Sequence, residues 1–145
     1  MDIDPSEMDR LIEAHIGAEI AGDSATAVAV YTADVEHDVV GWPTGPTQGP
    51  DAARGFYDAL MTDFTTESMR RTRAYYGDAF CVTEHLTTGS FPGIFLGIPG
   101  HGRRVSFRML HIWEFRDGAI SRENIWLDSG AIAAQLSGPE PERHA

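Results

Sequence analysis

The sequence contains no lysine and a single cysteine, and each scarcity removes a class of chemistry. All 11 basic residues are arginine, so a Schiff-base lysine, a pyridoxal-phosphate anchor and a P-loop lysine are excluded. Cys81 has no partner for an intrachain disulfide. No apolar run approaches the ~20 residues of a membrane-spanning helix, and the N-terminus lacks the pattern of a signal peptide. We therefore expect a cytoplasmic protein.

Positive charge is also scarce, because 22 acidic residues face 11 basic ones and the formal net charge is -11. Binding to nucleic acid depends on neutralising phosphates with basic side chains, and binding to acidic membranes has the same requirement. The charge balance therefore predicts neither nucleic acid nor a membrane as a partner and leaves small molecules and other protein chains.

The length and composition are those of one globular domain. A chain of 145 residues with 42% hydrophobic and 23% charged residues lies near the average for such domains. We expect this domain to span residues 1–136, and the polar, proline-rich segment 137–145 to form a flexible tail.

Helix signals dominate the first half of the chain. Asp4-Pro5 is typical of a helix start, and apolar residues then recur at helical spacing until Gly22. Asp23 predicts the start of a shorter helix that ends at about Tyr31. A strand at 35–40, a turn-rich loop at 41–50 and a third helix that carries Phe56, Tyr57, Leu60, Met61 and Phe64 on one face are predicted to follow.

Strand signals dominate the second half. Four segments alternate in the manner of strands, Asp117-Gly118 marks a hairpin between the last two, and a short helix follows. The predicted strands are 67–76, 79–91, 103–116 and 119–128, and the predicted helix is 130–136. Helices followed by a meander favour an α+β fold, in which helices cover one face of a curved, mostly antiparallel sheet.

The strand at 103–116 presents one almost wholly apolar face, and His111 interrupts it. Alternation places His111 on the same face as Phe107, Met109 and Trp113. Such a histidine is either a hydrogen-bonded core residue or a pocket residue, and the pattern alone leaves both open.

The last strand ends in a candidate acid or base. Alternation places Asn124, Trp126 and Asp128 on one face, and Glu123 with Ile125 on the other. Apolar neighbours would raise the pKa of Asp128 and suit it to proton transfer near neutral pH. The structural alternative is that Asp128 caps the helix that follows.

His37 and His85 lie on other predicted strands. Each is either a surface residue or a further polar group of a pocket, in addition to His111 and Asp128. Three strand histidines could also hold zinc, but no HxH or HExxH spacing occurs, so we expect no metal.

Three stretches of the chain resemble the SnoaL-like polyketide cyclases of the nuclear-transport-factor-2-like superfamily. They are 49–57 (GPDAARGFY), 95–105 (FLGIPGHGRRV) and the pair 115–118 (FRDG) with 126–128 (WLD). The resemblance extends over residues 8–136. Gly100 and His101 stand where the family motif usually has proline and threonine, a difference expected to affect the loop at the pocket mouth.

The resemblance implies a cone of curved sheet closed by the N-terminal helices around a deep pocket, a homodimer, and chemistry that needs no cofactor. It assigns Asp128 as the acid/base and His37 as a pocket histidine, with His111 as the second and His85 as a further imidazole. The residues expected to bind substrate are Trp42, Tyr57, Trp113, Asn124 and Trp126.

The predicted function is therefore a cofactor-independent cyclase or isomerase. Asp128 would remove a proton beside a carbonyl of a polyketide-like or other small molecule, and histidines would donate to the oxygen where charge develops. The alternatives are hydration, dehydration or epoxide opening, and a small-molecule-binding dimer without catalytic activity.

Overall fold

The computed structural model describes residues 3–139 and confirms an α+β fold. The helices are α1 (Pro5–Ile20), α2 (Ser24–Ala27), the 3₁₀ turn η1 (Val28–Val30), α3 (Pro50–Asp63) and α4 (Ser129–Ser137). The strands are β1 (Tyr31–Val39), β2 (Thr47–Gln48), β3 (Thr65–Tyr76), β4 (Phe80–Phe91), β5 (Ile94–Phe95), β6 (Ile98–Pro99), β7 (Arg103–Arg116) and β8 (Ala119–Leu127).

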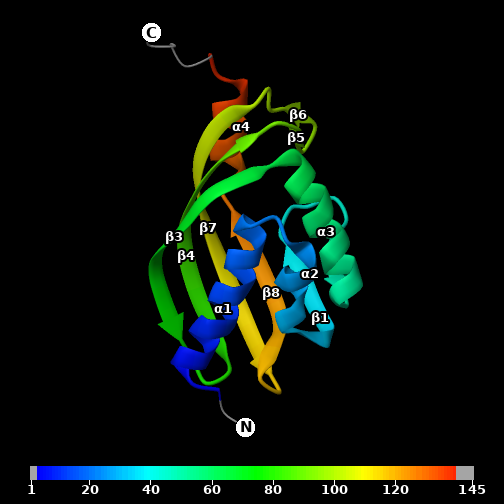
Figure 1. Ribbon diagram of the computed structural model, residues 1–145. Coiled ribbons are helices and arrows are strands. Elements are labelled where there is room, and N and C mark those ends of the chain that lie inside the picture. Colours follow the sequence, from blue (N-terminus) through cyan, green and yellow to red (C-terminus); the bar gives the residue numbers. More distant parts are fainter. Residues whose placement is uncertain (1–2, 140–145) are drawn as a thin grey trace.

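The main sheet has six strands in the order β2-β1-β8-β7-β4-β3 and is open at both edges. Every neighbouring pair is antiparallel except β1 and β8, which run parallel. The long strands β3, β4 and β7 curve strongly, and Figure 1 shows them bending around the side on which α1, α2 and α3 lie. The expected curved, mostly antiparallel sheet with helices over its inner face is thus confirmed, and the sheet itself is open.

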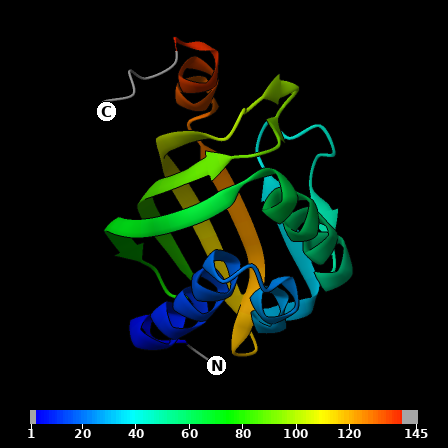
Figure 2. The ribbon, with the colours of Figure 1, turned by 45° about the horizontal axis from the view of Figure 1, so that its top comes forward.

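Helix α1 begins where the sequence predicts and packs through one stripe. Asp4 caps it by accepting a hydrogen bond from the Glu7 N–H, and Pro5 occupies the first turn. Its buried residues include Leu11, Ile12 and His15, at the helical spacing that faces the sheet. Figure 2 shows α1, α2 and α3 in front of the strands, with α4 at the opposite end of the sheet from α1.

Two hydrophobic clusters leave room for a pocket. The first lies between α1 and the ends of the central strands and contains the fully buried Met8, Ile12 and Trp113. The second gathers Phe64, Phe91, Phe107 and other apolar residues beneath α4. The first cluster is continuous packing, whereas the second forms the wall of a cavity.

The structure corrects several predicted boundaries. β1 starts at Tyr31 rather than residue 35, because the second helix is a single turn that passes into η1. The loop at 41–50 contains β2, and a small β5–β6 hairpin interrupts the segment after β4. The Asp117-Gly118 hairpin is confirmed, and both residues have the positive φ that its tight turn needs.

Two further expectations from the sequence concern membrane-spanning helices and the end of the domain. Within residues 3–139, no helix is both long and apolar enough to cross a membrane. α4 runs one residue past the predicted domain end at 136, and most of the predicted tail lies outside the described residues.

Candidate functional site

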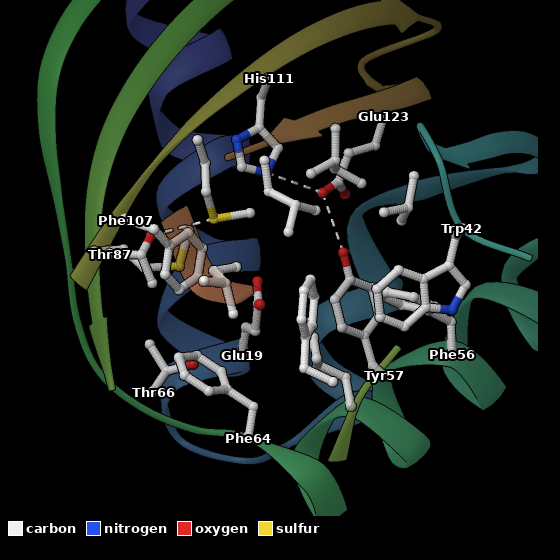
Figure 3. A pocket seen from close by; sticks show the side chains of 18 of the residues that line it. Glu19, Trp42, Phe56, Tyr57, Phe64, Thr66, Thr87, Phe107, His111 and Glu123 are labelled. Atoms are coloured by element: carbon white, nitrogen blue, oxygen red, sulfur yellow. Dashed lines mark hydrogen bonds and ion pairs between the residues drawn. The ribbon is translucent and has the colours of Figure 1, made fainter. Parts of the chain in front are cut away.

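A cavity opens between the helices and the inner face of the sheet, with an empty volume of about 580 Å³ that includes its mouth. Its lining is mostly aromatic and aliphatic, and its polar members are Glu19, Thr66, Thr87, His111 and Glu123 (Figure 3). The apolar members are Val39, Trp42, Phe56, Tyr57, Leu60, Phe64, Met69, Phe91, Phe95, Phe107, Met109, Ile125, Leu127 and Ile132. We call this cavity the pocket.

A buried carboxylate, Glu123 of β8, organises the polar end of the pocket. Its Oε1 lies 3.1 Å from His15 Nε2 and accepts a hydrogen bond from the Tyr31 hydroxyl. Its Oε2 accepts a hydrogen bond of 3.1 Å from the Tyr57 hydroxyl and lies 3.5 Å from His111 Nε2. These side chains come from α1, β1, α3 and β7, so four elements converge on one carboxylate. With His37, they form what we call the Glu123 cluster.

Tyr57 connects further histidines to this carboxylate. Its hydroxyl lies 3.0 Å from His15 Nε2 and 3.1 Å from His37 Nε2. His15 is anchored on its other side, because its Nδ1 lies 2.8 Å from the carbonyl oxygen of Ala27. His15 therefore has a carbonyl to accept from one nitrogen and a carboxylate to accept from the other, as an imidazolium requires.

The Glu123–His15 contact is an ion pair at neutral pH. Burial lowers the pKa of His15, but the charge and hydrogen bond of Glu123, the charge of Glu19 and the hydrogen bond to the Ala27 carbonyl together outweigh burial and raise the pKa to about 9. Burial likewise raises the pKa of Glu123, yet the charge and hydrogen bond of His15 hold it far below its ordinary range. The buried charges thus compensate each other, and the hydroxyls of Tyr31 and Tyr57 satisfy the remaining acceptor positions.

Glu19, one turn after His15 on α1, is a second carboxylate in the pocket. Only 11% of its side chain is exposed, and Figure 3 shows its carboxylate pointing into the space between the labelled side chains. Its Oε2 lies 3.8 Å from His15 Nε2, and it accepts no hydrogen bond from residues 3–139. Burial raises the pKa of Glu19 to about 7; the charge of His15 opposes the rise and that of Glu123 adds to it. Glu19 therefore exchanges protons near neutral pH.

The three buried strand histidines His37, His85 and His111 are neutral. Burial lowers the pKa of His111 to about 3, and burial with the charge of Arg71 lowers that of His85 to about 4. Burial also lowers the pKa of His37. The rings of His85 and His111 lie 5.8 Å apart, and neither Nδ1 has a hydrogen-bond partner among residues 3–139. Of these three residues, His111 lines the pocket directly.

Asp128, the expected acid/base, lies away from this cluster. It is exposed, and its Oδ1 accepts a hydrogen bond of 3.0 Å from the Ala131 N–H at the start of α4. It borders a shallow depression on the outer face of the sheet, together with Trp126 and Arg108. The structural alternative from the sequence, that Asp128 is a helix cap, is what the structure shows.

A β-bulge determines which face of β8 points inward. The hairpin pairs Arg116 with Ala119 and Phe115 with Ile120, but the register shifts by one residue before Glu114 pairs with Arg122. A shift of one residue exchanges the two faces of a strand. Trp113 therefore pairs with Glu123 and His111 with Ile125, which turns Glu123 inward and Asn124, Trp126 and Asp128 outward.

The predicted substrate-binding residues divide in the same way. Trp42 and Tyr57 line the pocket. Trp113 lies beneath it, stacked on His111 at 4.8 Å between ring centres and donating from Nε1 to the Thr83 hydroxyl. Asn124 and Trp126 are on the outer face, where the Trp126 Nε1–H donates to Asn124 Oδ1 and half of Trp126 is exposed.

Sequence reasoning missed four members of the site: His15, Glu19, Tyr31 and Glu123. His15 lies at the helical spacing of the apolar residues Leu11, Ile12 and Ile16, and Glu19 follows it by one turn. A histidine and a glutamate four residues apart on an apolar face were the available signal. Glu123 would have emerged from a strand register that included the bulge.

Two further expectations concern metals and the altered family motif. Among residues 3–139, no group of three or more His, Cys, Asp or Glu side chains is placed to hold a metal ion. The substituted pair Gly100 and His101 lies in the turn before β7, where Gly100 donates to the Gly93 carbonyl and His101 is exposed with a φ of 54°. Neither residue lines the pocket, but Gly100 packs against Phe91, which does, and a Cβ at position 100 would collide with the Phe91 carbonyl oxygen.

Comparison with solved structures shows how widely this fold occurs. A protein from Jannaschia sp. CCS1 described as a SnoaL-like polyketide cyclase is 17% identical, with 97% of this chain and 99% of that chain covered and a TM-score of 0.82. A protein from Xanthomonas campestris described as a polyketide cyclase is 20% identical, with 91% and 98% covered and a TM-score of 0.78. An LEH-like epoxide hydrolase of M. tuberculosis is 19% identical, with 90% of each chain covered and a TM-score of 0.71. At these identities the likeness establishes the fold alone.

The sequence itself carries a more specific relationship. No curated protein matches the chain in sequence. The model of the SnoaL-like polyketide cyclase family matches residues 11–136, which includes every member of the Glu123 cluster and Glu19. The chain therefore belongs to the SnoaL-like polyketide cyclase family.

Proposed function

We propose that this protein is a cofactor-independent acid/base enzyme that removes a proton next to a carbonyl group of a small apolar molecule and directs the resulting enolate. One observation carries the proposal: Glu19 is a carboxylate with a pKa of about 7 inside an apolar pocket, next to a carboxylate that a fixed ion pair keeps charged. Two titratable groups whose environments separate their pKa values are typical of acid/base sites. Membership of the cyclase family supports the same chemistry.

The proposed reaction uses Glu19 as the base in place of Asp128. The ionised Glu19 carboxylate takes a proton from the carbon beside the carbonyl, and the electron pair of that C–H bond forms the enolate. For ring closure, the enolate carbon attacks a second carbonyl in the same molecule, and the proton held by Glu19 passes to the alkoxide that forms. The proton count is unchanged at the end, so the cycle needs no cofactor or oxidant.

His111 and Tyr57 are the pocket groups that support this step. His111 is neutral and donates a hydrogen bond from Nε2 in the tautomer that carries its proton there. Its 3.5 Å contact with Glu123 is long enough to be exchanged for a substrate oxygen. Tyr57 holds Glu123 and lines the same wall. The apolar lining excludes water and strengthens both interactions.

Opening of an epoxide or addition of water is the second candidate, because the fold is shared with an LEH-like epoxide hydrolase. In that reaction Glu19 would take a proton from a water molecule instead of from carbon. The two reactions differ in product: water-derived oxygen appears in the product of the second and is absent from that of the first. A module that binds a small molecule without reaction would show neither outcome.

Deuterium exchange tests proton abstraction without knowledge of the natural substrate. A flat bicyclic ketone such as 2-tetralone is incubated in D₂O with the protein, and loss of the signal of the protons beside the carbonyl is followed by NMR. We expect exchange above the buffer rate, lowered roughly 10²-fold or more in Glu19→Gln, as is typical for loss of a general base. Glu13→Gln is the matched control, because Glu13 is exposed on the same helix.

Asp128→Asn separates this assignment from the one that the sequence favoured. We expect Asp128→Asn to exchange at the wild-type rate. Loss of exchange in Asp128→Asn with full activity of Glu19→Gln would return the role of the base to Asp128. Exchange equal to that of buffer over a series of ketones would refute the proposed class of reaction.

A further inference from the structure

Aromatic rings form a continuous wall on one side of the pocket. The ring centres of Trp42 and Phe56 lie 5.5 Å apart at a near-perpendicular angle, and those of Trp42 and Phe95 lie 6.1 Å apart. Phe56 in turn meets Tyr57 edge to face at 5.3 Å. The faces of such rings carry partial negative charge and attract cations that approach within about 6 Å.

The charged side chains that line the pocket are the carboxylates Glu19 and Glu123. None of the described lining residues is an arginine, and the only lining histidine, His111, is neutral. The one buried imidazolium, His15, already compensates Glu123. Ionised Glu19 is therefore the charge for which the residues around the pocket provide no separate partner.

We propose that the natural substrate carries a positively charged nitrogen, a protonated or quaternary ammonium, which lies against the wall of Trp42, Phe56 and Phe95 in the field of the Glu19 carboxylate. The part of this proposal that concerns the reaction rests on the proposed function. The part that concerns binding of the cation rests only on the residues of the pocket. The carbonyl end of the same molecule lies toward His111.

Charge balance during the reaction favours such a substrate. When Glu19 takes a proton, its negative charge moves onto the enolate, and the lining that residues 3–139 provide contains no free cation to receive it. An ammonium group on the substrate compensates Glu19 before the transfer and the enolate after it, so no unpaired charge is created in a low-dielectric site. A carboxylate on the substrate would have the opposite effect and would face Glu19, Glu123 and a chain of net charge -11.

Three probes of similar shape test the charge preference: benzyltrimethylammonium, its uncharged carbon isostere neopentylbenzene, and benzylsulfonate. Dissociation constants are measured by NMR titration at pH 8, following the Trp42 indole signal to confirm binding in the pocket. We expect the ammonium to bind roughly tenfold or more tightly than the neutral isostere, as for desolvated cation–aromatic contacts, and benzylsulfonate to bind more weakly than either. Equal or weaker binding of the ammonium would overturn the proposal.

The pH dependence identifies the carboxylate responsible. The titratable groups that face Glu19 are His15, Glu123, Tyr31 and Tyr57, and none of these changes charge between pH 6 and 8, whereas Glu19 does. We expect affinity for the ammonium probe to rise across this range in the wild type. In Glu19→Gln it should be weaker at pH 8 and independent of pH, while neopentylbenzene binds both proteins alike.

Paired variants locate the cation. Trp42→Leu should remove most of the preference for the ammonium over the neutral isostere, whereas Trp126→Leu, on the outer face, should leave it unchanged. A preference that survives Trp42→Leu and Glu19→Gln together would refute the site. Because these measurements involve no turnover, ammonium preference without deuterium exchange would contradict only the proposed reaction, and exchange without ammonium preference only the proposed substrate.

Discussion

Replacing Glu19 by glutamine should stabilise the protein at alkaline pH, although it removes the proposed base. The pKa of Glu19 rises from its ordinary value of 4.5 to about 7 because the folded chain buries the carboxyl group. One pKa unit corresponds to ~1.36 kcal/mol. The ionised group therefore costs the folded state about 3 kcal/mol above pH 7 relative to a carboxyl group that remained at 4.5.

The sign follows from proton binding. Between pH 4.5 and 7, folded Glu19 holds a proton that the unfolded chain has lost, so the free energy of unfolding falls as pH rises through this range. Below 4.5 both states are protonated, and above about 7 both are ionised. Glutamine resembles the protonated form at every pH, so the advantage of Glu19→Gln over wild type should be close to zero at pH 4.5 and reach a few kcal/mol at pH 8.5.

Urea unfolding at these two pH values measures the difference directly. Glu13→Gln, at an exposed position of the same helix, should show no such pH-dependent advantage. If Glu19→Gln is no more stable than wild type at pH 8.5, or if its advantage is the same at both pH values, then Glu19 is ordinarily solvated and the argument for it as the base is lost.

Four further outcomes follow from the same structure. Glu123→Gln should lose about 3–5 kcal/mol of stability in urea at pH 7, because it leaves the His15 imidazolium buried without its partner. Asp128→Asn should change stability by less than about 0.5 kcal/mol, since asparagine caps helices as well as aspartate does. Deuterium exchange should survive dialysis against a chelator, and metal that restored lost activity would contradict the mechanism. Sedimentation should show twice the mass of one chain, and a monomer at micromolar concentration would contradict the expected homodimer.

The parts of the fold that follow from local sequence patterns could be predicted. The start of α1 depends on Asp4 and Pro5, and the hairpin at Asp117-Gly118 depends on two residues that accept a positive φ. The inward face of β7 depends on simple alternation, which holds from Val105 to Phe115. In each case the residues that determine the structure are neighbours in the chain.

The candidate site could be predicted only in part, because it depends on distant contacts. Tyr57 and His111 were recognised from their own elements, but the pairing of His15 with Glu123 joins the first helix to the last strand of the sheet. The side of β8 that faces inward depends on a bulge near Ser121, and the sequence of the hairpin gives no sign of the extra residue. The family resemblance assigned the acid/base to Asp128. A hairpin without the extra residue would turn that face of the strand inward, whereas the bulge turns Glu123 inward.

Glu123 and Glu19 differ in how many hydrogen-bond and ion-pair partners they have, and this difference separates a structural carboxylate from a candidate functional one. Glu123 pairs with the His15 imidazolium and accepts hydrogen bonds from the hydroxyls of Tyr31 and Tyr57. A structural role, that of holding α1, α3 and the sheet together, is enough to account for a buried network whose groups are all paired. Glu19 lies beside that network, 3.8 Å from the His15 imidazolium that already pairs with Glu123, and accepts no hydrogen bond from residues 3–139. A buried carboxylate that shares its cation with another carboxylate and accepts no hydrogen bond destabilises the fold when it is ionised, and proteins tolerate such groups chiefly where a ligand or a reaction uses them. The cost at Glu19 is therefore the strongest structural reason to expect chemistry in this pocket.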